Sequence, residues 1–210
     1  MSAGEWSDPA HVAHYLSRTG GSGRGEEGDR ALLELIAPGA RRVLDLGTGD
    51  GRLLALLKAA FPGLQGVGVD SSRLMLDAAC SRFAGEDSVE LIEHDLAQPL
   101  GDLGRFDAVV SSLAIHHLEH ERKRELYGEV LRALVPGGTF ANLEHVASPS
   151  ARLHRAFFAA IEEPLEREDP SDRLIDVETQ LGWLREHGFQ DVDCHWKWRE
   201  LAVLTGVRPL

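Results

Sequence analysis

The 210-residue chain contains few of the features that mark extracellular, metal-stapled or membrane-spanning proteins. Its two cysteines, Cys80 and Cys194, lie far apart and give neither a disulfide framework nor a zinc-binding spacing. No apolar run approaches the ~20 residues needed to span a bilayer, and the first residues lack the basic stretch and apolar core of a secretion signal. We therefore expect a cytoplasmic protein that does not interact with a membrane.

Positive charge is also scarce. The chain has 22 Lys and Arg against 34 Asp and Glu, a formal net charge of −12, and no Lys or Arg run that indicates a basic patch. Such a surface repels phosphate backbones, so nucleic acid is not an expected partner. The length is sufficient for one domain with a substantial core.

Short apolar segments alternate with amphipathic segments along most of the chain. The apolar segments that predict strands are residues 41–47, 63–72, 89–96, 105–111 and 138–146. Such alternation is typical of βαβ units and a parallel sheet. Residues 190–198 and 200–207 follow each other closely and predict an antiparallel pair. The expected fold is an α/β, Rossmann-like, doubly wound and mostly parallel sheet with a C-terminal antiparallel hairpin.

Two segments fall outside this alternation, but the whole chain, residues 1–210, is expected to be a single domain. Residues 1–28 predict a lid helix followed by a Gly-rich hinge, "TGGSGRGEEG", after which Asp29 caps the next helix. Residues 148–176 are interrupted by prolines and dense in charge. They predict a helical cap inserted over the sheet.

The stretch "VLDLGTGDG", residues 43–51, places three glycines directly after the first predicted strand. The dinucleotide fingerprint G-x-G-x-x-G requires a third glycine where this chain has Arg52. The carboxylates of Asp45 and Asp50 would oppose a pyrophosphate, although a helix N-terminus favours anions. We therefore favour a cationic ligand at this loop, namely S-adenosylmethionine, over a nicotinamide dinucleotide.

The next two predicted strands also end in carboxylates. An acidic residue at the end of the second strand, here Asp70, can accept hydrogen bonds from both ribose hydroxyls. At the end of the third strand, Asp95 would accept from an adenine amino group and Leu96 would lie against the ring. These positions suit the adenosine part of the same ligand.

Five segments in order, "VLDLGTGDGRL", "GVGVDSS", "IEHDL", "FDAVVSSLAIHHL" and "LVPGGTF", resemble the motifs of class I S-adenosylmethionine-dependent methyltransferases. The resemblance covers about half of the chain, and the last helix and hairpin also resemble the end of that family. It implies an enzyme that transfers a methyl group from S-adenosylmethionine. The segment "SSLAIHHL" resembles the branch that acts on small molecules, so the implied partner is a small-molecule acceptor.

Matching positions imply roles for individual residues. The methionine end of the cofactor would contact Asp45, Gly47, Thr48 and Gly49. The adenosine would contact Asp70, Ser71, Met75, Asp95 and Leu96. The face of methyl transfer would be lined by Ser111, Ser112 and Leu113. Tyr15, on the first predicted helix, would touch the methionine moiety if that helix folds over the cofactor.

His116 and His117 follow the fourth predicted strand, where acceptor and methyl donor would meet. Histidine is a natural base near neutral pH, and His117 is the favoured candidate by its place before Leu118. The other histidines near strands, His94, His145 and His195, lack ligand-type spacing, so no metal site is expected.

The predicted cap offers residues for acceptor recognition. Phe157 and Phe158 would line the pocket, and Arg152 or Arg155 would anchor an acidic group of the substrate. The alternative is that both phenylalanines only pack the cap onto the sheet. Two other function classes also fit the cofactor motifs: a non-catalytic module that binds S-adenosylmethionine, and a nicotinamide-dependent oxidoreductase.

Overall fold

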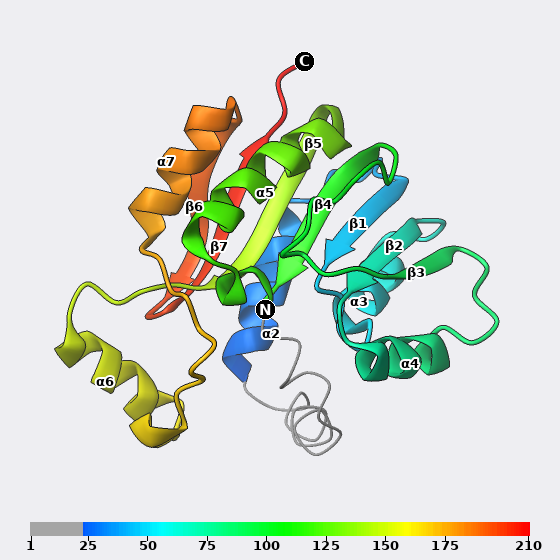
Figure 1. Cartoon of the computed structure of the whole chain (residues 1–210). Helices are drawn as coiled ribbons and strands as arrows, with labels where there is room; N and C mark the ends of the chain where they lie inside the picture. Colours follow the sequence, from blue (N-terminus) through cyan, green and yellow to red (C-terminus); the bar gives the residue numbers. More distant parts are fainter. Residues whose placement is uncertain (1–22) are drawn as a thin grey trace.

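A seven-stranded sheet runs through the computed structural model, which describes residues 23–210 (Figure 1). Its strands are β1 (Arg42–Leu46), β2 (Gln65–Asp70), β3 (Val89–Glu93), β4 (Phe106–Ser112), β5 (Leu134–His145), β6 (Gln190–Trp198) and β7 (Leu201–Val207). In space they follow the order β3-β2-β1-β4-β5-β7-β6. Only β7 is antiparallel to its neighbours, β5 and β6. The predicted Rossmann-like sheet with a C-terminal antiparallel hairpin is therefore confirmed.

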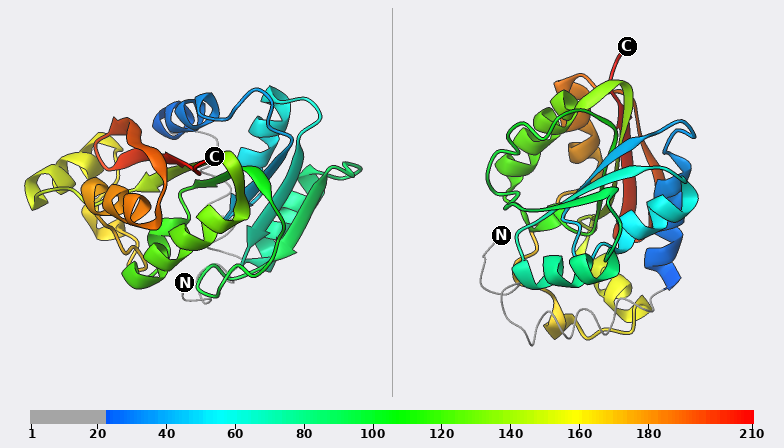
Figure 2. Two further views of the ribbon diagram at one scale, coloured as in Figure 1. Left: turned by 90° about the horizontal axis from the view of Figure 1, so that it is seen from above. Right: turned by 90° about the vertical axis from the view of Figure 1, so that its right-hand side faces the viewer.

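Helices cover both faces of this sheet (Figure 2). On one face lie α2 (Gly23–Glu34) and α3 (Arg52–Ala60), and on the other lie α5 (His120–Ala133) and α7 (Val177–His187). The helix α4 (Arg73–Arg82) packs against β2 and β3. Within residues 23–210, no helix is both long and apolar enough to cross a membrane.

The central strands are buried on both faces, which explains their nearly continuous apolar sequence. Leu44 and Val109 belong to the core beneath α5 and α7, whereas their chain neighbours Val43, Ala108 and Val110 belong to the core beneath α2 and α3. Successive side chains of a strand point to opposite faces, so each strand contributes to both cores.

The helix α2 differs from the prediction. It begins at Gly23 rather than at Asp29, so residues 23–28 of the predicted Gly-rich hinge are helical. Asp29 is not its N-cap but a buried residue inside the helix, paired with Arg52. Packing explains the glycine at position 28, because a Cβ there would lie 2.7 Å from a methyl carbon of Leu143. The predicted lid helix lies outside the described residues.

The predicted cap is only partly helical. It contains α6 (Ala151–Ala160) and the short 3₁₀ helix η2 (Leu165–Arg167), and residues 168–176 contain no helix. Figure 1 shows α6 beyond the end of the sheet where β4 and β5 finish. Between the neighbours β1 and β4 the strand order reverses, and ligands of such sheets bind at the carboxyl ends beside this point. The cap therefore lies on the side of the expected site.

Candidate active site

The glycine loop after β1 is bound to the end of β2 and to the loop after β4. The backbone N–H groups of Gly47 and Thr48 both donate to the carbonyl of Val69 at 2.9 Å. Gly47 has φ +71°, and a Cβ there would lie 2.2 Å from the Cβ of Ala114. A side chain at this position would thus displace the segment that carries the paired histidines.

Asp45 is buried beneath this loop, with 1% of its surface exposed. Its Oδ2 accepts a hydrogen bond from the Thr48 hydroxyl at 2.7 Å, but its buried Oδ1 has no hydrogen-bond partner among the described residues. Burial raises the pKa of Asp45 to about 7, with the Thr48 hydrogen bond acting in the opposite direction. A buried, unsatisfied carboxylate oxygen is suited to a cationic ligand.

Asp70 braces the glycine loop. Its Oδ2 accepts from the N–H of Gly49 at 2.8 Å, and its Oδ1 accepts from the N–H of Ser72 at 2.8 Å. Burial raises the pKa of Asp70, and these hydrogen bonds oppose the rise. Each carboxylate oxygen has a second lone pair, so both bonds are compatible with a ribose contact. Ser72, and not Ser71, caps α4.

The second carboxylate of the loop, Asp50, pairs with Arg82 of α4, so its charge is already compensated. At the end of β3, Asp95 accepts from the N–H of Ala97 at 2.9 Å, while Leu96 is fully buried. Met75 is buried under the loop, and its terminal methyl would lie 3.1 Å from a Cβ on Gly49.

The end of β4 holds two serines in different surroundings. Ser111 is fully buried and donates to the carbonyl of Leu46 at 2.8 Å, which joins β4 to β1. Ser112 donates to Asp29 at 3.2 Å, and Asp29 also pairs with Arg52 at the start of α3. Leu113 follows with φ +54°, an uncommon conformation for a residue other than glycine, where the chain turns into the histidine segment. The sequence pattern gave Asp29 only a capping role.

His116 and His117 lie in the 3₁₀ helix η1 (Ile115–His117) and are both buried. His116 Nδ1 lies 3.2 Å from Glu144 Oε1 at the end of β5, and its Nε2 lies 3.5 Å from Asp172 Oδ1. His117 Nδ1 lies 3.4 Å from the same oxygen of Asp172. Burial, together with the charge of His116, lowers the pKa of His117 to about 4.

From Asp172 the contacts extend to His145, Glu200 and His154, so that carboxylates and imidazoles alternate. His145 Nδ1 lies 3.2 Å from Asp172 Oδ2, and its Nε2 lies 3.1 Å from Glu200 Oε2. Burial alone would lower the pKa of His145, but the hydrogen bonds to Asp172 and Glu200 outweigh it and raise the pKa to about 9. His154 of α6 lies 3.0 Å from the other oxygen of Glu200. Neither Asp172 nor Glu200 belongs to a motif that the sequence made recognisable.

The predicted acceptor residues of the cap lie in two environments. Phe157 and Phe158 are buried in a small cluster with Leu201, and Trp198 packs at its edge. Arg152 is exposed on α6. Both phenylalanines attach α6 to the β6–β7 hairpin, and Phe157 also contacts the ring of His145, with ring centroids 5.3 Å apart. Tyr15 lies outside the described residues.

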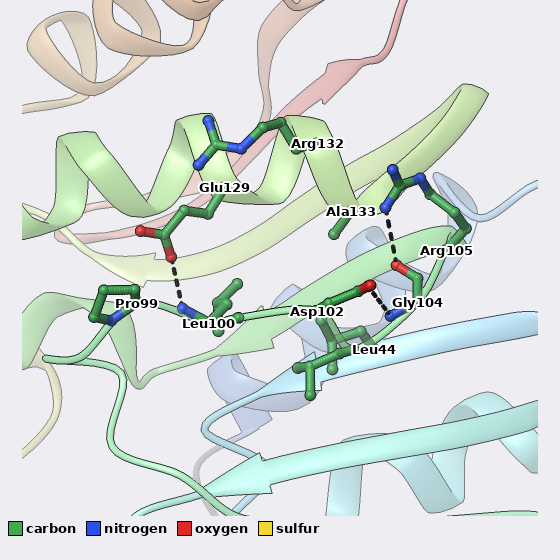
Figure 3. Close-up of a pocket in the computed structure, with 11 residues that line it drawn as sticks. Leu44, Pro99, Leu100, Asp102, Gly104, Arg105, Glu129, Arg132 and Ala133 are labelled. Carbon is green, nitrogen blue, oxygen red and sulfur yellow. Dashed lines mark hydrogen bonds between the residues drawn. The ribbon is translucent and has the colours of Figure 1, made fainter.

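A cavity of about 260 Å³ lies elsewhere, beside the amino ends of β4 and β5 (Figure 3). Its walls include the segment before β4, which is held by a hydrogen bond of 3.0 Å from the N–H of Leu100 to Glu129 of α5. Figure 3 shows Arg132 and Arg105 at its rim. Because ligands of doubly wound sheets bind at the carboxyl ends, this cavity is not the expected site.

Comparisons with known proteins agree with the fold and the glycine loop. Residues 43–138 match the family model described as "Methyltransferase domain". The chain is 31% identical over 196 residues to a demethylmenaquinone methyltransferase of Clavibacter sepedonicus, covering 85% of this chain and 78% of the relative. It is 32% identical over 136 residues to a trans-aconitate 2-methyltransferase of Acidovorax sp. (strain JS42), covering 61% of this chain and 50% of that relative.

Solved structures show the same fold. An O-methyltransferase family protein from Burkholderia thailandensis aligns with TM-score 0.73 and 23% identity over 89% of this chain and 56% of that chain. Human N-acetylserotonin methyltransferase in complex with SAM aligns with TM-score 0.65 and 16% identity, over 87% of this chain and 52% of that chain. The present chain thus spans about half the length of these structures.

The fold and the glycine loop define an S-adenosylmethionine-binding α/β protein. The chain belongs to the class I S-adenosylmethionine-dependent methyltransferase family, and its cofactor is S-adenosylmethionine. This assignment sets aside the nicotinamide-dependent alternative.

Proposed function

We propose that the chain methylates a compact, polar small molecule bound between η1 and the cap. The observation that carries this proposal is the set of ionisable side chains gathered beyond β4 and β5, namely His116, His117, Glu144, His145 and Asp172. Buried polar groups need partners, so this lining favours an acceptor with hydroxyl or amino groups over a purely apolar one. The relatives cited above are named for small-molecule acceptors.

On the cofactor side, the residues present fit S-adenosylmethionine. The unsatisfied Oδ1 of Asp45 suits the ammonium group, and the backbone of Gly47 and Gly49 is proposed to contact the methionine tail. Asp70 is proposed to accept from the ribose hydroxyls while it braces the loop. The proposed adenosine contacts are Ser71, Met75, Asp95 and Leu96, and the proposed methionine-end and methyl-face contacts include Thr48, Ser111, Ser112 and Leu113.

The cofactor supplies an electrophilic methyl group on its sulfonium. The acceptor atom would take this methyl group in one displacement, with S-adenosylhomocysteine as the other product. The protein contributes alignment and exclusion of water. When the acceptor atom is a hydroxyl oxygen or an amino nitrogen, a proton is released, and His116 and His117 are the proposed groups beside it.

The test is methyl transfer from labelled S-adenosylmethionine into a cell extract divided into aqueous metabolites and lipids. We expect label in a low-mass aqueous product, with an equal amount of S-adenosylhomocysteine. Label confined to the lipid fraction would contradict a polar acceptor. Binding of S-adenosylhomocysteine without turnover in either fraction would favour the non-catalytic alternative.

A further inference from the structure

One cluster on the acceptor side has the composition of a metal site. His116, His117 and Asp172, called here the acceptor-side triad, each present a ligand atom within 4.8 Å of the other two. The histidines come from η1, and the aspartate comes from the irregular segment after η2. Spacing along the chain does not reveal such a set, because folding brings together residues more than fifty positions apart.

The separations inside the triad are close to those in a coordination sphere. Asp172 Oδ1 lies 3.5 Å from His116 Nε2 and 3.4 Å from His117 Nδ1. Two ligands bound tetrahedrally at about 2.0–2.1 Å from one ion are about 3.3 Å apart. Both separations from Asp172 are therefore near those of ligands that share an ion, and the ligand atoms of all three residues lie within 4.8 Å of one another.

Two members of the triad are also held by a neighbour of the kind that orients metal ligands. His116 Nδ1 faces Glu144 Oε1 at 3.2 Å, which leaves Nε2 toward Asp172, and Asp172 Oδ2 lies 3.2 Å from His145 Nδ1. The Ser171 hydroxyl lies 2.9 Å from His117 Nδ1, the nitrogen that faces Asp172, and would leave that nitrogen when an ion binds. Partners of this type fix ring orientation and raise ligand basicity in known sites.

Asp172 Oδ1 is buried and has no hydrogen-bond partner among residues 23–210, and the 3.2 Å contact of His116 Nδ1 with Glu144 Oε1 is an ion pair without hydrogen-bond geometry. The backbone nearby is fixed, since the N–H of Arg173 donates to the carbonyl of His116 at 2.9 Å. The buried ammonium of Lys123 binds the carbonyl of Arg173. Unsatisfied buried acceptors are rare, and Asp172 Oδ1, flanked by both imidazoles, would gain a partner in a bound cation.

We propose that His116, His117 and Asp172 bind a divalent first-row transition-metal ion. Two imidazoles and one carboxylate suit zinc, manganese, iron, cobalt or nickel better than magnesium or calcium. Three protein ligands leave a position for water or for an oxygen or nitrogen of the acceptor. Binding of the acceptor by the ion rests on the proposed function. In that role the ion, rather than a free imidazole, would activate the oxygen or nitrogen of the acceptor.

The test uses chelator-treated full-length protein titrated with Co²⁺, followed by visible absorption and by calorimetry. We expect one ion per chain, and about 10–100-fold weaker binding in the separate variants His116→Gln and Asp172→Asn. The matched control is His195→Gln, which changes a half-exposed histidine next to Glu34 and should bind Co²⁺ like the wild type. Normal binding of S-adenosylhomocysteine shows that each variant is folded.

Weak, non-stoichiometric Co²⁺ binding by a wild-type protein that binds S-adenosylhomocysteine would overturn the metal site. Equal Co²⁺ affinity in the wild type and both triad variants would overturn it as well. Stoichiometric, triad-dependent binding without any methyl transfer would support the site and contradict the proposed function, so the two failures are distinguishable.

Discussion

The carboxylate of Asp45 shows how a single residue can couple cofactor binding to pH. Its burial and its unsatisfied Oδ1 make the ionised form costly unless a cation is present, and its pKa is raised to about 7. The ammonium group of the cofactor would favour the ionised form. Protons and cofactor therefore compete for this carboxylate.

The affinity for S-adenosylhomocysteine should rise with pH up to about 7 and then level off. Well below the pKa, the loss approaches about tenfold per pH unit, because protonation must be reversed before the ammonium binds. Calorimetry from pH 5.5 to 8 measures this, and Asp45→Asn should give weaker binding with a flatter profile. A pH-independent affinity in the wild type would exclude Asp45 as the ammonium partner.

The raised pKa of Asp45 also makes the stability of the ligand-free protein depend on pH. The pKa of Asp45 in the folded protein lies above the ordinary aspartate value of 3.8, so its contribution to stability is largest below pH 3.8 and is lost as pH rises to about 7. Melting temperatures of the wild type and Asp45→Asn should therefore converge at low pH and diverge, in favour of the variant, as pH approaches 7.

At the scale of residues, the sequence predicts best where the topology fixes position. Asp45 and Asp70 could be assigned to one edge because parallel strands share their carboxyl ends. Asp172 and Glu200 could not be assigned, since one lies in an irregular segment and the other in the turn of a hairpin. The prediction that Asp29 caps a helix was wrong, because this residue is instead buried and paired with Arg52.

At the scale of elements, the contact between the glycine loop and the segment after β4 joins cofactor and acceptor sides. A Cβ on Gly47 would overlap Ala114, whereas Gly63 has φ +88° with no atom within 4 Å of the added carbon. Gly47→Ala should thus lower the free energy of unfolding by about 1–3 kcal/mol more than Gly63→Ala. Denaturant unfolding measures the difference, and equal losses would mean that the loop contact is not tight.

Variants in the cap helix α6 can distinguish acceptor recognition by the cap from a purely structural role of its phenylalanines. Phe157 is buried against the hairpin cluster, so Phe157→Ala should lower the melting temperature by removing core contacts. Arg152 is exposed, and Arg152→Ala should leave stability unchanged. If Arg152 anchors the acceptor, this variant raises the acceptor's KM without changing affinity for S-adenosylhomocysteine. Unchanged kinetics would remove Arg152 from acceptor recognition.

The start of α2 shows why some elements escape sequence analysis. Glycine is a poor helix former, so "GRGEEG" predicts a hinge. The packing of α2 against β5, β6 and β7 overrides that preference, and Gly28 permits the close approach to Leu143. The strands, by contrast, carried strong apolar patterns, and most were predicted to within two residues. The exceptions are β5, which begins four residues before the predicted strand, and β3, which ends three residues before the predicted end.

At the scale of the whole molecule, the sheet order divides the site into two halves. The proposed cofactor side lies at the ends of β1, β2 and β3, and the proposed acceptor side lies beyond β4 and β5 and under the cap. The fold, the family and the cofactor could be predicted from the order of the motifs. The acceptor side could not, because its network joins η1, β5, the cap and the β6–β7 turn.

The most direct test of the account is a calorimetric titration of S-adenosylhomocysteine into the wild type and Asp70→Ala, with NADH as the comparison ligand. The account predicts one site per wild-type chain, no NADH binding, and affinity about 10–100-fold lower in the variant, since charge-assisted hydrogen bonds to ribose and the brace on Gly49 are lost together. Absence of binding in the wild type, or equal affinity in a folded Asp70→Ala, would contradict it.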